Sequence, residues 1–105
     1  MNNEITQIKA HENEIIEYII NELYKIDLSI DVNKLKIDSN KVMLEIQINH
    51  NTKRIQSSIF FTDIKYIFIK GLTKAQVFLS DTDIKMCGML TKKNLLLKLT
   101  IELNK

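Results

Sequence analysis

The hydrophobic period of this chain changes near Ile26, from helical spacing before that residue to strict alternation after it. Before it, apolar residues recur every three or four positions, at Ile5, Ile8, Ile15, Ile16, Ile19, Ile20 and Leu23. This spacing is typical of an amphipathic helix, which we expect over about residues 3–25. Alternating apolar and polar residues describe strands with one wet face, so we expect antiparallel strands over about residues 26–103.

Turn-forming residues divide this second part into strands. The first runs from Ile26 to Ile37, with a slip of parity at Asn33 and Lys34 that requires a bulge or bend. The remaining strands are expected at Val42–Ile48, Ile55–Ile69, Ala75–Ser80, Ile84–Leu90 and Leu95–Leu103. The predicted fold class is therefore α+β, with an N-terminal amphipathic helix packed on a curved antiparallel sheet of five or six strands. With 105 residues, no Pro and no linker-like stretch, a single domain over 1–105 is expected.

The segment Ile59–Ile69 is apolar at both strand parities. One parity carries Ile59, Phe61, Ile67 and Ile69, and the other carries Phe60, Ile64, Tyr66 and Phe68. If this segment is a strand, both of its faces need cover, and one helix shields only one face of a sheet. A surplus of apolar surface usually marks a contact site. We therefore assign an interface to Phe60, Phe61, Tyr66 and Phe68, and expect the chain to form a homo-oligomer.

Charge is distributed unevenly along the chain. Residues 1–31 carry a net charge of −5 and residues 32–105 carry +7. Four cations, Lys53, Arg54, Lys65 and Lys70, are close in sequence to the aromatic residues, and this mixture is able to hold phosphates and stack bases. The alternative hypothesis is therefore a nucleic-acid or nucleotide binder that uses the basic face of the sheet. An acidic helix and a basic sheet that complement each other within an assembly would explain the same asymmetry.

No motif for catalysis or metal binding stands out. Cys87 lies in an apolar predicted strand, where a thiol usually behaves as a small hydrophobe. The acidic residues of 81–83 fit a turn between two strands. His11 and His50 have no ligand-type residues at zinc spacing. We therefore expect a protein that is not an enzyme and that uses no metal and no cofactor.

Composition bears on the setting in which the protein acts. The 18 Ile, 14 Lys and 10 Asn against 2 Ala and 1 Arg indicate an AT-rich code, as in a low-GC bacterium, a phage or a mobile element. A lone cysteine and the lack of a signal-peptide pattern or membrane span predict a cytoplasmic protein. The function expected from these features is a small non-enzymatic binding module that covers or sequesters a protein partner, as an accessory or inhibitory protein. The partner, the oligomer number and the strand order are not specified by the sequence.

Overall fold

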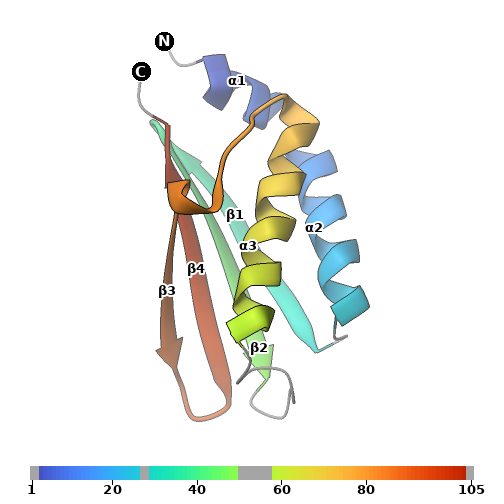
Figure 1. Cartoon of the computed structure of the whole chain (residues 1–105), viewed down its shortest axis with the longest axis vertical. Helices are drawn as coiled ribbons and strands as arrows, with labels where there is room; N and C mark the ends of the chain where they lie inside the picture. The colour runs from blue at the N-terminus through green and yellow to red at the C-terminus, as the bar shows by residue number, and fades with distance from the viewer. Residues whose placement is uncertain (1–2, 27–28, 50–57, 104–105) are drawn as a thin grey trace.

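The computed structural model describes residues 3–26, 29–49 and 58–103, which form three α-helices and a four-stranded antiparallel sheet (Figure 1). Along the chain the elements are α1 (Asn3–Ala10), α2 (Glu12–Ile26), β1 (Ile30–Asp38), β2 (Lys41–Asn49), α3 (Ser58–Leu72), the 3₁₀ turns η2 (Thr73–Ala75) and η3 (Asp81–Asp83), β3 (Ile84–Leu90) and β4 (Asn94–Glu102). The predicted α+β class and antiparallel sheet are confirmed.

The sheet consists of two hairpins joined through their second strands, in the order β1-β2-β4-β3. The parity slip predicted at Asn33 is a register shift between Val32 and Lys34 in the pairing of β1 with β2. The tight β1–β2 turn contains Ser39 at a φ of 53°. Because β2 and β4 occupy the centre, β1 and β3 are the two edges of the sheet.

The expected strand Ile55–Ile69 is wrong, because the backbone from Ser58 to Leu72 is the helix α3. Its β-branched and aromatic residues favour a strand, but packing against the sheet overrides that local preference. In helical geometry the two apparent faces become one wide apolar arc, with Ile64, Phe68 and Leu72 fully buried. Within the described residues the sheet therefore has four strands, where five or six were expected.

Two further expectations need correction. The expected strand Ala75–Ser80 is wrong, since η2 is followed by a connection that pairs with no strand of the sheet. The single expected helix over residues 3–25 is two helices that meet at His11, whose N–H donates to the carbonyls of Gln7 and Ile8. Most of the predicted apolar positions are buried, and Ile16 and Ile20 are half-buried, so the amphipathic pattern holds across the bend.

The core lies between the helices and one face of the sheet. Alternate strand residues point toward the helices and are buried, as the alternation predicts; they are Ile30, Leu35, Val42, Leu44, Ile46, Ile48, Ile84, Leu95, Leu97, Leu99 and Ile101. Gly71 of α3 lies where a Cβ atom would approach Cγ1 of Ile19 to 3.0 Å. A glycine at this position therefore permits the close approach of α3 to α2.

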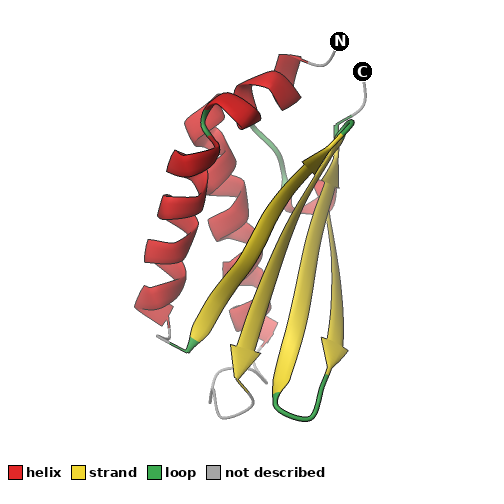
Figure 2. Ribbon diagram, turned by 180° about the vertical axis from the view of Figure 1, so that it is seen from behind, coloured by secondary structure: helices red, strands yellow, loops and turns green. Residues whose placement is uncertain are grey.

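The opposite face of the sheet is open, because all three helices lie on the other side (Figure 2). This open face carries mostly polar side chains on β1 and β2, and apolar ones toward β3, where Cys87, Met89 and Leu96 share it. Among the described helices, none has both the length and the apolar character that a membrane crossing requires.

Candidate interaction surface

The outer edge of β3 pairs with no other described strand, and no ribbon element lies beside it in either view (Figures 1 and 2). The Thr91 N–H donates to the Asn94 carbonyl at 2.8 Å, which closes the β3–β4 hairpin with a hydrogen-bonded pair. Bonded and non-bonded pairs alternate along an antiparallel ladder, so Lys85, Cys87 and Met89 direct their backbone groups toward β4. Ile84, Met86, Gly88 and Leu90 direct their N–H and C=O groups outward.

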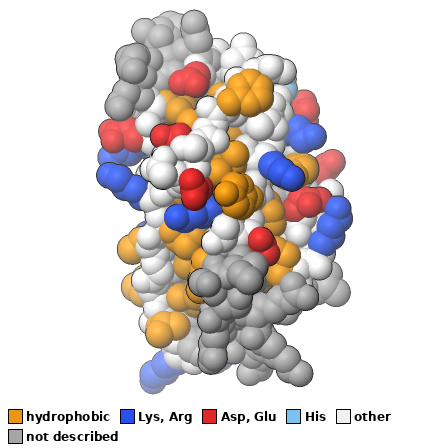
Figure 3. Space-filling model, viewed as in Figure 1, with side chains coloured by type: hydrophobic (Ala, Val, Ile, Leu, Met, Phe, Trp, Pro, Cys, Tyr) orange, Lys and Arg blue, Asp and Glu red, His pale blue; other side chains and the backbone are white. Residues whose placement is uncertain are grey.

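The side chains of this strand are apolar and become exposed toward its C-terminal end. Met89 is 56% exposed on the open face, and Leu90 is 71% exposed on the helix side. Cys87 and Gly88 are exposed as well, and Lys85 is the only charged residue of the strand. Apolar side chains are visible on the corresponding flank in the space-filling view (Figure 3). Phe78, in the connection that leads to β3, is 71% exposed.

Opposite charges lie at the two ends of β3. At its start, η3 holds Asp81 and Asp83, both exposed. Asp83 caps the turn, since its carboxylate accepts hydrogen bonds from the Ser80 N–H at 2.9 Å and the Ser80 hydroxyl at 3.2 Å. At its end, the β3–β4 hairpin carries Lys92 and Lys93, which are exposed too.

A shallow hollow of about 400 Å³ lies on the open face beside β3. Its lining mixes cations, anions and apolar groups: Lys41, Asp83, Lys85, Met86, Cys87, Lys98, Thr100 and Glu102. The Cys87 thiol is free and exposed, on a strand that lies where the sequence predicted one. Lys98 is its directly opposite residue on β4.

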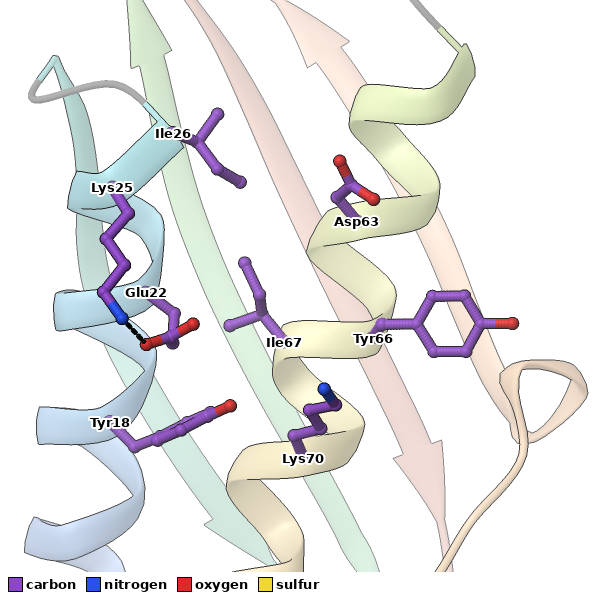
Figure 4. Close-up of a pocket in the computed structure, with 8 residues that line it drawn as sticks. All are labelled: Tyr18, Glu22, Lys25, Ile26, Asp63, Tyr66, Ile67 and Lys70. Carbon is purple, nitrogen blue, oxygen red and sulfur yellow. Dashed lines mark hydrogen bonds and ion pairs between the residues drawn. The ribbon is translucent and has the colours of Figure 1, made fainter.

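A second groove, of about 290 Å³, lies between α2 and α3 on the outer surface of the helices (Figure 4). Glu22 and Lys25 form an ion pair at 2.7 Å along one wall, which raises the pKa of Lys25. Burial, and secondarily the Glu22 carboxylate, raise the pKa of Tyr18, whose ring also carries the Lys74 ammonium 5.1 Å from its centroid. Glu22 and Lys25 are thus engaged with each other, whereas no interaction joins Asp63, Tyr66 or Lys70 to another of the residues drawn (Figure 4).

The residues predicted as an interface belong to α3, and the three whose side chains are described differ in exposure. Phe68 is fully buried in the core and Phe61 is half-buried, whereas Tyr66 is 48% exposed at the α2–α3 groove. The side chain of Phe60 lies outside the described residues. The expected strand with two apolar faces is therefore wrong, because these residues form a helix that covers the sheet together with α2.

The residues of the alternative hypothesis do not lie on the sheet where they are described. Lys65 and Lys70 belong to α3, and Lys70 lines the α2–α3 groove; Lys53 and Arg54 lie outside the described residues. The four strands contain no aromatic residue on which a base would stack. Lysines on the open face are interleaved with carboxylates, as where Lys34, Glu45 and Lys98 lie side by side across three strands.

The described residues hold no group of three or more His, Cys, Asp or Glu side chains that would bind a metal ion. Comparison of the chain with protein-family models, with curated proteins and with solved structures gave no match. The assignment of a site in this protein therefore rests on the geometry of the described residues. The sequence signal for the β3 edge is the low charge of residues 84–90, which contain one lysine.

Proposed function

We propose that the protein is a non-enzymatic interaction module that binds a polypeptide by strand addition at the outer edge of β3. In strand addition, an extended segment forms main-chain hydrogen bonds with a free sheet edge, and neighbouring side chains give selectivity. This proposal retains the non-enzymatic binding module expected from the sequence. It assigns the contact surface to β3 in place of the aromatic residues of α3.

The observation that carries this proposal is the unprotected state of that edge. Sheet proteins usually guard a free edge with charged residues, Pro, a bulge, a very short strand or a covering element. In β3, seven residues contain one lysine, no Pro and no register shift, and their outward backbone groups meet no described element. An exposed apolar edge of this length attracts another strand.

Amide hydrogen exchange tests whether the edge is available. In dilute solution we expect the outward amides of Met86, Gly88 and Leu90 to exchange quickly. The inward amides of Cys87 and Met89 should exchange slowly, because they donate to β4. Uniformly slow exchange at every dilution would contradict the proposal, since it would mean that the chain covers its own edge.

For the biological setting, the bias toward Ile, Lys and Asn supports a role as an accessory or inhibitory protein of a low-GC bacterium, phage or mobile element. Such a protein acts by occupying a surface of its partner. Recovery of the gene from a GC-rich genome would contradict this part of the proposal.

A further inference from the structure

We infer that the partner of the β3 edge is the β3 edge of a second copy of this chain, paired antiparallel about a two-fold axis at Cys87. This inference rests on the proposed strand addition and specifies its occupant. The resulting dimer would join the two sheets into one continuous eight-stranded sheet, with the helices of both copies on the same side.

Backbone geometry fixes the register. A two-fold axis at Cys87 places Cys87 of one copy opposite Cys87 of the other. The numbers of any two paired residues then add up to 174, so that Ile84 pairs with Leu90 and Met86 pairs with Gly88 of the second copy. These four residues are the ones whose N–H and C=O groups point outward. This register alone pairs all seven residues of the strand, and every outward group then gains a partner.

Side chains agree with the same register. On the helix side, Met86 lies opposite Gly88 of the second copy. Because Gly88 has no side chain, the side chains of Leu95 and Leu97 are the nearest to the position that its Cβ would occupy. The Met86 side chain of one copy therefore covers apolar atoms of the other. Leu90, 71% exposed in the single chain, lies opposite Ile84. On the open face, Lys85 lies opposite Met89, so that the lysines of the two strands do not face each other.

Charge at the strand ends supplies an independent argument for a second copy. Antiparallel pairing brings the start of one β3 beside the end of the other. The exposed Asp81 and Asp83 then approach Lys92 and Lys93 of the second copy, and the symmetry repeats this contact at the opposite end. Complementary charge of this kind selects a partner and its orientation.

The contact is one strand wide and about 24 Å long at 3.4 Å per residue. A contact of this width and length buries less surface than a standard stable interface, which buries about 800 Å² on each partner. We expect a reversible dimer with a dissociation constant on the order of micromolar, so experiments need protein well above that concentration.

Disulfide trapping of the native Cys87 tests the register directly. Residues opposite each other in a non-hydrogen-bonded antiparallel pair have Cα atoms about 4.5 Å apart, within the range that a disulfide spans. Diamide removes two electrons and two protons from the two thiols as the S–S bond forms. We expect rapid conversion of the concentrated protein to a covalent dimer, and no conversion in dilute solution.

Matched variants move the thiol along the same face of the same strand. In K85C/C87S, the two new cysteines are four residues out of register, about 14 Å apart, so that trapping is expected to be lost. M89C/C87S alone should fail for the same reason. A mixture of these two variants should form the covalent heterodimer, because positions 85 and 89 lie opposite each other.

The pattern of trapping decides the proposal. Trapping at 87 and between 85 and 89 supports it, whereas equal trapping of all variants indicates random collision and overturns it. Absence of trapping with a strictly monomeric mass by light scattering also overturns it. If the outward amides still exchange quickly in that case, strand addition to a different polypeptide survives, so the two proposals fail separately.

Discussion

The two edge strands of the sheet, β1 and β3, differ in charge and in the regularity of their pairing. β1 carries Asp31, Lys34, Lys36 and Asp38, and a register shift interrupts its pairing with β2. β3 carries only Lys85 and has a regular register. Charges and bulges prevent edge-to-edge pairing. The comparison therefore indicates that one edge is closed to other strands, and that the other is open.

The two edge strands also differ in how deeply their residues are buried. Strand β1 contacts α2 and buries Ile30 completely, whereas the last four residues of β3 are all exposed. Exposure of apolar residues at β3 is thus confined to one end of one edge strand, which is the end that meets the partner's η3 in the proposed dimer.

The largest expected effect is a loss of stability from a substitution in the core between the helices and the sheet, which supports both edge strands. Phe68→Ala empties a fully buried position between α3 and the sheet, and should lower the free energy of unfolding by about 3–5 kcal/mol. Denaturant titration measures this loss. Tyr66→Ala, on the exposed side of the same helix, is the control and should change stability by less than about 1 kcal/mol. Equal losses would contradict the assignment of the core.

The charges on β1 should prevent this edge from pairing. In Lys34→Val/Lys36→Val, two exposed cations of β1 become apolar, so both edges of the sheet should accept strands and the chain should form assemblies larger than a dimer. Sedimentation velocity would detect these assemblies. A variant that stays at the wild-type size would show that the bulge, and not the charges, closes this edge.

A smaller effect is expected at the strand ends. Asp81→Lys and Lys93→Asp each place like charges together in the dimer, and each should weaken dimerisation several-fold, because exposed pairs contribute about 0.2–1 kcal/mol. The double variant restores opposite charges and should recover wild-type affinity. If the double variant is weaker than either single variant, the ends of β3 do not meet as proposed.

The smallest effect involves the α2–α3 groove, away from both edges. Burial and the Glu22 carboxylate raise the pKa of Tyr18 above its ordinary value of 10.0. The folded chain therefore holds the phenol proton where the unfolded chain releases it. The contribution of the protonated Tyr18 phenol to the free energy of unfolding is therefore fully present below pH 10, and it is lost as the pH rises through the pKa of the folded state.

Tyr18→Phe keeps the ring beneath Lys74 but cannot ionise, so its melting temperature should fall less between pH 9 and pH 11 than that of the wild type. Thermal melts monitored by circular dichroism give the comparison. Parallel curves for the two proteins would exclude Tyr18 as a source of the alkaline loss.

Much of the fold could be predicted from local pattern. The alternation located β1, β2, β3 and β4, and the helical spacing located the buried isoleucines of α1 and α2. Helix α3 was missed because its residues have high strand propensity and its polar positions are few. Asp63, Tyr66 and Lys70, at spacings of three and four, were the helical signal.

The candidate site could not be predicted because it depends on strand order. Residues 84–90 have the composition of an interior strand, and only the pairing of β2 with β4 places them at an edge. Without that order, an apolar segment with a cysteine suggests core, and the exposed thiol of Cys87 has no sequence signature.

Sedimentation of charge variants at Cys87 tests the central claim most directly. The residue is exposed, so Cys87→Lys and Cys87→Glu should each fold normally, yet each places two like charges face to face at the two-fold axis. We predict that each variant alone sediments as a 12.3 kDa monomer and that an equimolar mixture sediments at twice that mass. A mixture that stays monomeric where the wild type is dimeric, or single variants that dimerise like the wild type, would contradict pairing of β3 with β3.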